Sequence, residues 1–387
     1  MSRRLRILFV SHSRKDPNGG ASRVFHLLED GLVARGHEVT AVHRGDLPMT
    51  QRLGKFAERL AMPQVISLDA RRYDPASFDV IMAPSGILYP LYRRLRARAS
   101  RPLLVQHLLG ANFFDHFATL EEGVRGHLPL SPAYRLLTGR LPVAWDLKGA
   151  RAADLQVVNC GRDLDYMIDQ GIADCVHIPL ALHPDIAAHA RRRAVEPGPP
   201  RDRRAVFWFG SWSDRKGIAY LPRAWRLVRQ RFPDATLTLG ATGMPSTAIK
   251  TGFAAEDRNS ITVLGRISVA EQLAEMDRHA IFLFPSISEG FGFALLEAMA
   301  GGLAPVATLT GMGADFLRDR DNAMVVPPAS SIHMADAVAR LMEDESLSAR
   351  IGGQAARDAS QLTAERMVGA YEDLFLDRLD RRGASPR

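Results

Sequence analysis

Short apolar segments alternate with amphipathic helical patterns along the whole chain, and this alternation restricts the possible fold more than any other feature. Such alternation predicts α/β domains in which helices cover both faces of a parallel sheet. The strand candidates of the first half are 6–10, 38–42, 65–68, 80–83, 103–106, 155–159 and 176–179. Those of the second half are 205–209, 236–239, 261–264, 281–284, 305–308 and 324–326.

The length of 387 residues is sufficient for two such domains. The segment 191–204 is rich in arginine, proline and glycine, so we predict that it is neither strand nor stable helix and that it links the domains. This assigns residues 1–190 to an N-terminal domain and 205–361 to a C-terminal one. The tail, 362–387, has a helical pattern of apolar residues among charges.

A glycine loop precedes the first predicted helix. Val24, Leu28 and Leu32 recur at helical spacing within 21–35, and Gly36 is placed as a C-terminal stop. Backbone N–H groups at a glycine pair can approach a phosphate without a side chain in the way. Gly19 and Gly20 are a weak signal by themselves, but their place between the first strand and this helix makes them phosphate-binding candidates.

Two glutamates eight positions apart follow the apolar run 281–284. Pro285 ends the strand, and the glycines beyond Glu289 let the chain turn into a short helix that contains Glu297. The start of a helix favours a bound phosphate, whereas the two carboxylates would repel one and suit hydroxyl groups. Phosphate beside vicinal hydroxyls indicates a nucleotide or a nucleotide-sugar.

The alternative is an ordinary buried strand and helix. Against it, Glu297 shares a helix face with Phe293, Ala294 and Ala300, and a carboxylate on such a face usually has a partner. Two Asp-x-Asp triplets, 163–165 and 319–321, could hold a divalent ion, but their positions at a helix start and in a turn favour structural roles.

Composition limits the cellular location and the kinds of ligand that the protein can have. The two cysteines are too few for a disulfide framework, which favours a reduced cytoplasm, and no apolar segment is long enough to span a bilayer. A net charge of +7 suits phosphate ligands, anionic lipid or nucleic acid. No nucleic-acid module is recognisable, so nucleic acid ranks last. The arginines of 93–101 could lie on an anionic membrane, although a solvated helix face is equally compatible.

Glu289 and Glu297, with Gly290-Phe291-Gly292 between them and Ala298-Met299-Ala300-Gly301-Gly302 after them, resemble the signature of retaining glycosyltransferase family 4. The resemblance implies a GT-B fold, which consists of two facing Rossmann-like domains with an interdomain cleft. It also implies a nucleotide-sugar donor, a metal-independent reaction that retains anomeric configuration, and a C-terminal helix that crosses back to the first domain.

The resemblance assigns roles to individual residues. Glu289 would hold the transferred sugar and Glu297 the ribose diol. Lys216 and the N–H groups from Gly290 to Phe293 would absorb the charge that develops on the departing diphosphate. Family members often carry a second cation, whose usual position is occupied by Ser211, so Arg215 is the candidate to supply it. His107 would contact the donor sugar.

The sequence therefore predicts a retaining hexosyltransferase that uses a nucleotide-diphosphate sugar and a glycan, lipid-linked or small-molecule acceptor, in bacterial surface polysaccharide or glycoconjugate synthesis. It would act in the cytoplasm or at the cytoplasmic face of the membrane, with no cofactor and no metal. Two alternatives remain open. One is a non-catalytic nucleotide-sugar-binding partner subunit, and the other is a nucleotide-sugar epimerase or a sugar phosphorylase on the same fold.

Overall fold

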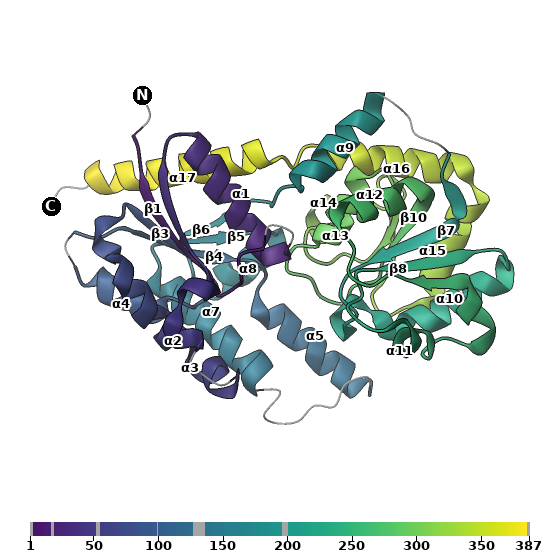
Figure 1. Ribbon diagram of the computed structural model, residues 1–387, viewed down its shortest axis with the longest axis horizontal. Coiled ribbons are helices and arrows are strands. Elements are labelled where there is room, and N and C mark those ends of the chain that lie inside the picture. The colour runs from purple at the N-terminus through teal and green to yellow at the C-terminus, as the bar shows by residue number, and fades with distance from the viewer. Residues whose placement is uncertain are drawn as a thin grey trace. The chain divides into compact units, whose positions relative to one another are not determined.

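The computed structural model describes residues 3–16, 19–51, 55–98, 100–126, 136–195 and 200–384. They form two compact units. Unit 1 comprises Met1–Phe117, Leu130–Ala181 and Ala364–Arg387, and unit 2 comprises Ala118–Pro129 and Leu182–Thr363. Each unit is built on its own six-stranded parallel sheet (Figure 1).

The sheet of unit 1 has the order β2-β1-β3-β4-β5-β6. Its strands are β1 (Arg6–Val10), β2 (Glu38–Val42), β3 (Val80–Pro84), β4 (Leu103–Leu108), β5 (Leu155–Val158) and β6 (Cys175–His177). Strand β2 pairs with one edge of β1, and β3 pairs with the other edge. The strand order therefore reverses between β1 and β3. Six of the seven strands predicted in this half are confirmed to within two residues.

Helices cover both faces of this sheet. They are α1 (Gly20–Ala34), α2 (Pro48–Gln51), α3 (Lys55–Ala70), α4 (Tyr89–Arg96), α5 (Asn112–Val124, whose end belongs to unit 2), α7 (Leu141–Ala152), α8 (Gly161–Asp169) and α17 (Ala364–Ala384). Leu8 and Val10 pack with Leu91 of α4 on one face, and Phe9 contacts Phe25 of α1 on the other. Gly36 has a φ of 93°, in agreement with the predicted helix stop.

The strand predicted at 65–68 is wrong, because these residues lie inside α3. Gln64 and Leu68 are exposed while Val65, Ile66 and Ala70 are buried, which is the spacing of a helix. An apolar run of this length does not distinguish a strand from one turn of a buried helix.

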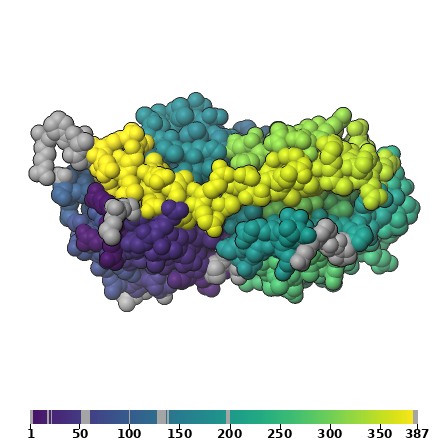
Figure 2. All heavy atoms as spheres, turned by 90° about the horizontal axis from the view of Figure 1, so that it is seen from above, coloured from purple at the N-terminus to yellow at the C-terminus, as the bar shows by residue number. Residues whose placement is uncertain are grey.

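The last helix, α17, belongs to unit 1 and packs along α1 (Figure 2). Tyr371 and Phe375 are completely buried. The Glu372 carboxylate accepts hydrogen bonds from Arg35 Nη1 at 2.5 Å and from His37 Nε2 at 3.0 Å. Helix α17 is therefore held in unit 1 both by the burial of its apolar side chains and by the hydrogen bonds of Glu372.

The sheet of unit 2 has the order β12-β11-β10-β7-β8-β9, and every neighbouring pair is parallel. Its strands are β7 (Asp202–Phe209), β8 (Thr236–Gly240), β9 (Ile261–Val263), β10 (His279–Phe284), β11 (Ala304–Ala307) and β12 (Met324–Val325). All six predicted strands are confirmed. Successive strands run outward from β7 on one side and from β10 on the other, so the reversal lies between β7 and β10.

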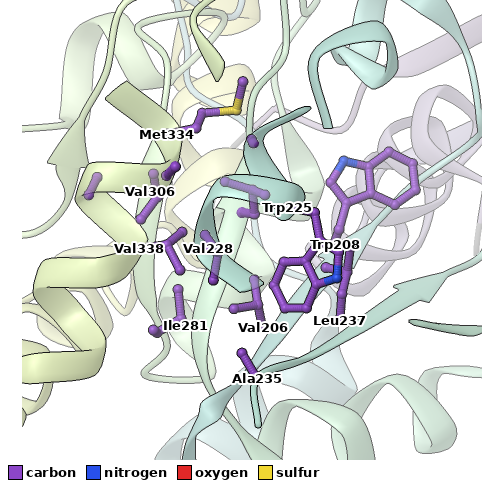
Figure 3. Packing of buried hydrophobic residues seen from close by; sticks show 14 of the residues in the cluster. Val206, Trp208, Trp225, Val228, Ala235, Leu237, Ile281, Val306, Met334 and Val338 are labelled. Atoms are coloured by element: carbon purple, nitrogen blue, oxygen red, sulfur yellow. The ribbon is translucent and has the colours of Figure 1, made fainter. Parts of the chain in front are cut away.

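A hydrophobic core of unit 2 lies between this sheet and several of its helices. Trp208 and Val206 pack against Trp225 and Val228 of α10 and against Val338 of α15 (Figure 3). The helices of the unit are α9 (Pro184–Val195), α10 (Leu221–Arg231), α11 (Ser246–Lys250), α12 (Val269–Arg278), α13 (Phe293–Ala300), α14 (Gly313–Phe316), α15 (Ser331–Glu343) and α16 (Glu345–Ala359). None of the helices in the described ranges of either unit combines the length and hydropathy that a membrane-spanning segment needs.

The interpretation of 191–204 as neither strand nor helix is wrong for most of the segment. Helix α9 continues to Val195 and β7 begins at Asp202, while 196–199 lie outside the described residues. Ile186 and His189 bury one side of α9, so its last arginines extend a helix that is already anchored. Residues 182–190, which we assigned to the first domain, lie in unit 2.

Replacement of Glu372 by Gln is expected to lower the melting temperature at pH 7, by an amount equivalent to about 1–2 kcal/mol, because two charge-assisted hydrogen bonds are weakened. Burial alone would raise the pKa of Glu372, but the hydrogen bonds from His37 and Arg35 outweigh it and lower the pKa below its usual 4.5. A lowered folded-state pKa adds stability above pH 4.5 that disappears as the pH falls through the folded value. The difference between wild type and variant should therefore shrink below pH 4.5.

Differential scanning calorimetry across pH 3 to 8 would measure this effect. The exposed Asp373 on the same helix provides the control, since Asp373→Asn should leave the melting temperature nearly unchanged. A Glu372→Gln difference that is constant over the whole pH range would contradict the electrostatic explanation.

Candidate functional site

The central site residues of unit 2 lie in two loops at the carboxyl ends of neighbouring strands. Lys216 ends a short 3₁₀ turn, Asp214–Lys216, after β7, and Glu289 follows β10. The two strands are directly paired, with Val206 opposite Ile281. Because the strand order reverses between them, their loops border the crevice in which ligands of open parallel sheets bind.

The Glu289 carboxylate is buried and surrounded by donors. Its Oε1 accepts a hydrogen bond from Lys216 Nζ at 2.5 Å and another from Ser286 Oγ at 2.7 Å. Arg215 Nη1 lies 3.6 Å from Oε2. The exposed fractions of the side chains are 5% for Glu289, 12% for Lys216 and 40% for Arg215. A carboxylate at this depth needs a cation, and the structure supplies two.

Backbone contacts hold the two loops together. The N–H groups of Ile287 and Ser288 both donate to the Arg215 carbonyl oxygen, at 2.7 and 3.2 Å. Gly217 adopts a left-handed conformation with φ 70°, and a Cβ atom there would lie 2.1 Å from the Pro285 carbonyl oxygen. The approach of the lysine loop to the glutamate loop therefore requires glycine at 217.

The chain turns into α13 as predicted. Gly292 has a φ of 100° and precedes the helix, and its carbonyl oxygen accepts hydrogen bonds from the N–H groups of Leu295 and Leu296. The neighbouring loop closes against this turn, because Met312 N–H donates to the Phe291 carbonyl oxygen at 2.7 Å. Gly290, Phe291, Gly292 and Phe293 thus form a fixed turn at the entry to the helix that carries Glu297.

Glu297 is 3% exposed, and its Oε2 accepts a hydrogen bond from Gln272 Nε2 of α12 at 2.7 Å. The sequence motif gave no indication of Gln272. Two further supporting residues were missed, Ser286 on the carboxylate of Glu289 and Thr308, whose Oγ1 donates to the Ser286 carbonyl oxygen at 2.6 Å. Ser286 and Thr308 follow the ends of β10 and β11, and this position is a signal that could have found them.

Gly19, Gly20 and His107 belong to unit 1. Gly20 begins α1, and Gly19 caps it in an extended conformation while accepting a hydrogen bond from Arg23 N–H at 2.7 Å. Residues 17 and 18, which precede the two glycines, lie outside the described residues. The predicted place of the glycines between a first strand and a helix is thus confirmed, whereas their contact with phosphate stays a prediction.

His107 is completely buried at the end of β4. Its Nε2 lies 3.0 Å from Asn159 Oδ1 and 3.1 Å from Tyr371 Oη of α17. Burial lowers the pKa of His107 to about 4, against the opposing effect of the hydrogen bond to Asn159. The imidazole is therefore neutral at pH 7. Its contact with a donor sugar stays a prediction, and these surroundings favour the structural role that most histidines have.

The Asp-x-Asp triplets are engaged in structural contacts. Asp163 Oδ2 accepts from Ala111 N–H at 3.2 Å, and Asp319 Oδ1 accepts from Val325 N–H at 2.9 Å. Asp321 pairs with Arg318 at 2.8 Å. These contacts favour the structural interpretation of both triplets.

A Gly217→Ala substitution is expected to destabilise unit 2 by more than about 2 kcal/mol and to move Lys216 away from Glu289, since the added methyl group overlaps the Pro285 carbonyl at an unfavourable φ. Thermal unfolding measures the loss. Gly265→Ala is the matched control, because a Cβ atom there meets nothing within 4 Å. Equal melting temperatures for the two variants would show that the tight approach at 217 is not required.

Comparison with known proteins connects this site to a family. Residues 203–344 match the family model described as glycosyl transferases group 1. The chain is 30% identical over 179 residues to a phosphatidyl-myo-inositol mannosyltransferase of Mycolicibacterium smegmatis, over 46% of this chain and 45% of that protein. It is 30% identical over 210 residues to the protein of the same name from Mycobacterium tuberculosis, over 52% and 54%. The match thus spans about half the length of these relatives.

Solved structures resemble nearly the whole chain. A sucrose-phosphate synthase from Thermosynechococcus elongatus has a TM-score of 0.75 at 17% identity, over 97% of this chain and 100% of that one. An α,α-trehalose-phosphate synthase (UDP-forming) from Burkholderia xenovorans has a TM-score of 0.67 at 16% identity, over 97% and 100%. At these identities the similarity shows the fold alone. The two parallel six-stranded sheets with flanking helices are those of the predicted GT-B fold, and residues 203–344 are similar to the glycosyl transferases group 1 family.

Proposed function

We propose that the protein is a retaining glycosyltransferase that moves a hexose-type sugar from a nucleotide-diphosphate donor to a glycan, lipid-linked or small-molecule acceptor. The observation that carries this proposal is the buried Glu289 carboxylate, held by Lys216 and flanked by Arg215, between β7 and β10. The proposed setting is bacterial surface polysaccharide or glycoconjugate synthesis.

The charges at this position suit a sugar diphosphate. Lys216 and Arg215 carry two positive charges against the single negative charge of Glu289. The cations can turn toward phosphate oxygens, and the carboxylate, which repels phosphate, accepts hydrogen bonds from sugar hydroxyls. When the bond from the anomeric carbon to the diphosphate breaks, the electron pair leaves with the phosphate oxygen. Lys216, Arg215 and the turn from Gly290 to Phe293 would stabilise that charge.

Glu297 would bind the ribose diol of the donor. Its hydrogen bond from Gln272 fixes the orientation of the carboxylate before the ligand arrives, so less side-chain freedom is lost on binding. In this proposal the protein's own cations neutralise the diphosphate and the reaction needs neither a metal nor a cofactor at the donor site.

A lipid-linked acceptor would bring the protein to a membrane surface at the cytoplasmic face. The mycobacterial relatives are named for a lipid, phosphatidyl-myo-inositol. Arg93, Arg94 and Arg96 of α4 are exposed, whereas Leu91 and Leu95 are buried in the core of unit 1. Attraction of α4 to an anionic membrane would therefore depend on charge and weaken with salt.

Two substitutions separate binding from turnover. Lys216→Ala is expected to weaken nucleoside-diphosphate binding about tenfold or more, because a charge-assisted contact to phosphate is lost. Glu289→Gln is expected to lower turnover at least about 100-fold while the dissociation constant for the nucleotide changes only a few-fold. Isothermal titration with UDP, GDP, ADP and TDP, followed by a transfer assay with the sugar of the bound nucleotide, measures both effects.

Lys250→Ala and Glu345→Gln, also in unit 2, are the matched controls and should behave as wild type. Failure of the wild type to bind any nucleotide would overturn the proposal. Normal turnover by Glu289→Gln would assign that carboxylate to structure alone. Nucleotide binding without transfer to any acceptor would instead support a non-catalytic partner subunit, and an inverted product anomer would exclude retention.

A further inference from the structure

Three potential metal ligands gather in unit 1, and none of them is among the residues assigned above. His26 and Glu29 lie three positions apart on α1, and His43 directly follows β2. Each offers one nitrogen or oxygen atom, and these atoms all lie within 4.8 Å of one another. The helix and the strand therefore place two imidazoles and one carboxylate around a single point.

The cluster contains buried polar atoms without hydrogen bonds. His43 is only 3% exposed, and neither of its ring nitrogens has a hydrogen-bond partner among the described residues. The same holds for His26 Nδ1 and Glu29 Oε2. Buried polar groups in folded proteins are nearly always paired, since an unpaired one destabilises the fold by about 1–3 kcal/mol. Several such atoms facing one another need an explanation, and a bound cation provides one.

The distances are close to those of a zinc site. His26 Nδ1 lies 3.7 Å from Glu29 Oε2, and the rings of His26 and His43 are 6.0 Å apart between centroids. Tetrahedral zinc with bonds of about 2.0–2.1 Å separates its ligand atoms by about 3.3–3.4 Å. The ligand atoms would therefore need to move by about 1 Å to reach the separation of a tetrahedral site.

The charges of the neighbouring groups are compatible with a cation. Glu29 and Asp46 place negative charge near His43, against the positive charge of Lys15. Lys15 is exposed, so solvent screens its repulsion of a bound ion, whereas Glu29 contributes a negative charge at contact distance.

We propose that His26, Glu29 and His43 bind one divalent transition-metal ion of the zinc class, with water in the fourth position. Two histidines and one glutamate are an established ligand set for such ions. The ion would connect α1 to the end of β2 and so fix the helix that begins at Gly20. This site is distinct from the donor site of unit 2, where we propose no metal, and it does not rest on the proposed transferase activity.

The test uses the full chain after treatment with a chelator. Titration with ZnCl₂ is expected to give one ion per chain and a higher melting temperature, and Co²⁺ should show the absorption of a tetrahedral site. His43→Gln and Glu29→Gln should each weaken zinc binding at least about 100-fold, because each removes one of three ligands. His333→Gln, an exposed histidine of unit 2, and Lys216→Ala should bind zinc as wild type does.

Circular dichroism and metal-free unfolding establish that each variant is folded. If His43→Gln does not fold, His26→Gln takes its place, since the His26 side chain is 16% exposed and substitution there is milder. The proposal is overturned if the wild type binds no zinc, or if the folded His43→Gln or Glu29→Gln variant binds it undiminished. Loss of zinc binding with unchanged nucleotide binding would separate this site from the donor site.

Discussion

The ion pair between Lys216 and Glu289 is the interaction on which the arrangement of unit 2 depends. A carboxylate that is 5% exposed is unfavourable without a cation, so the loop after β7 must approach the loop after β10. That approach is possible only because the two strands are neighbours at the reversal of strand order and because Gly217 has no Cβ atom. The topology brings the two loops together, and the attraction between the charges of Lys216 and Glu289 then determines the distance between their side chains.

Unit 1 is organised around a different kind of contact. Its buried polar groups, His107 with Asn159 and Glu372 with His37, join the sheet and α1 to a helix from the far end of the chain. Burial of Tyr371 and Phe375 stabilises the packing of α17 but depends little on its exact position, because the hydrophobic effect is non-directional. The hydrogen bonds are directional and therefore specify the register of α17. This explains why a histidine at a strand end, which sequence reasoning connects with a ligand, can serve the fold instead.

The fold and the main motif could be predicted because both depend on patterns within short segments of the sequence. Strand-length apolar runs with helical patterns between them specify a parallel sheet, and the spacing of Glu289 and Glu297 identifies the motif. The failures have a common cause. The apolar pair Val65 and Ile66 is compatible with a buried strand and with a buried helix, and only tertiary packing determines which of the two forms. Gln272 donates to Glu297 from a separate helix, so no pattern in the sequence around Glu297 predicts this contact.

Both sheets are six-stranded and parallel, but they differ in strand order and in the chemistry of their loops. In unit 2 the reversal of strand order lies between loops that carry Lys216 and Glu289, whereas in unit 1 the loop after β1 leads to Gly19 and Gly20. The cluster of His26, Glu29 and His43 lies one strand away, where β2 ends. The sheets fix where loops begin, and the residues in those loops decide what is bound. A cation at this cluster would stiffen α1, the helix that begins at Gly20, without occupying the reversal point.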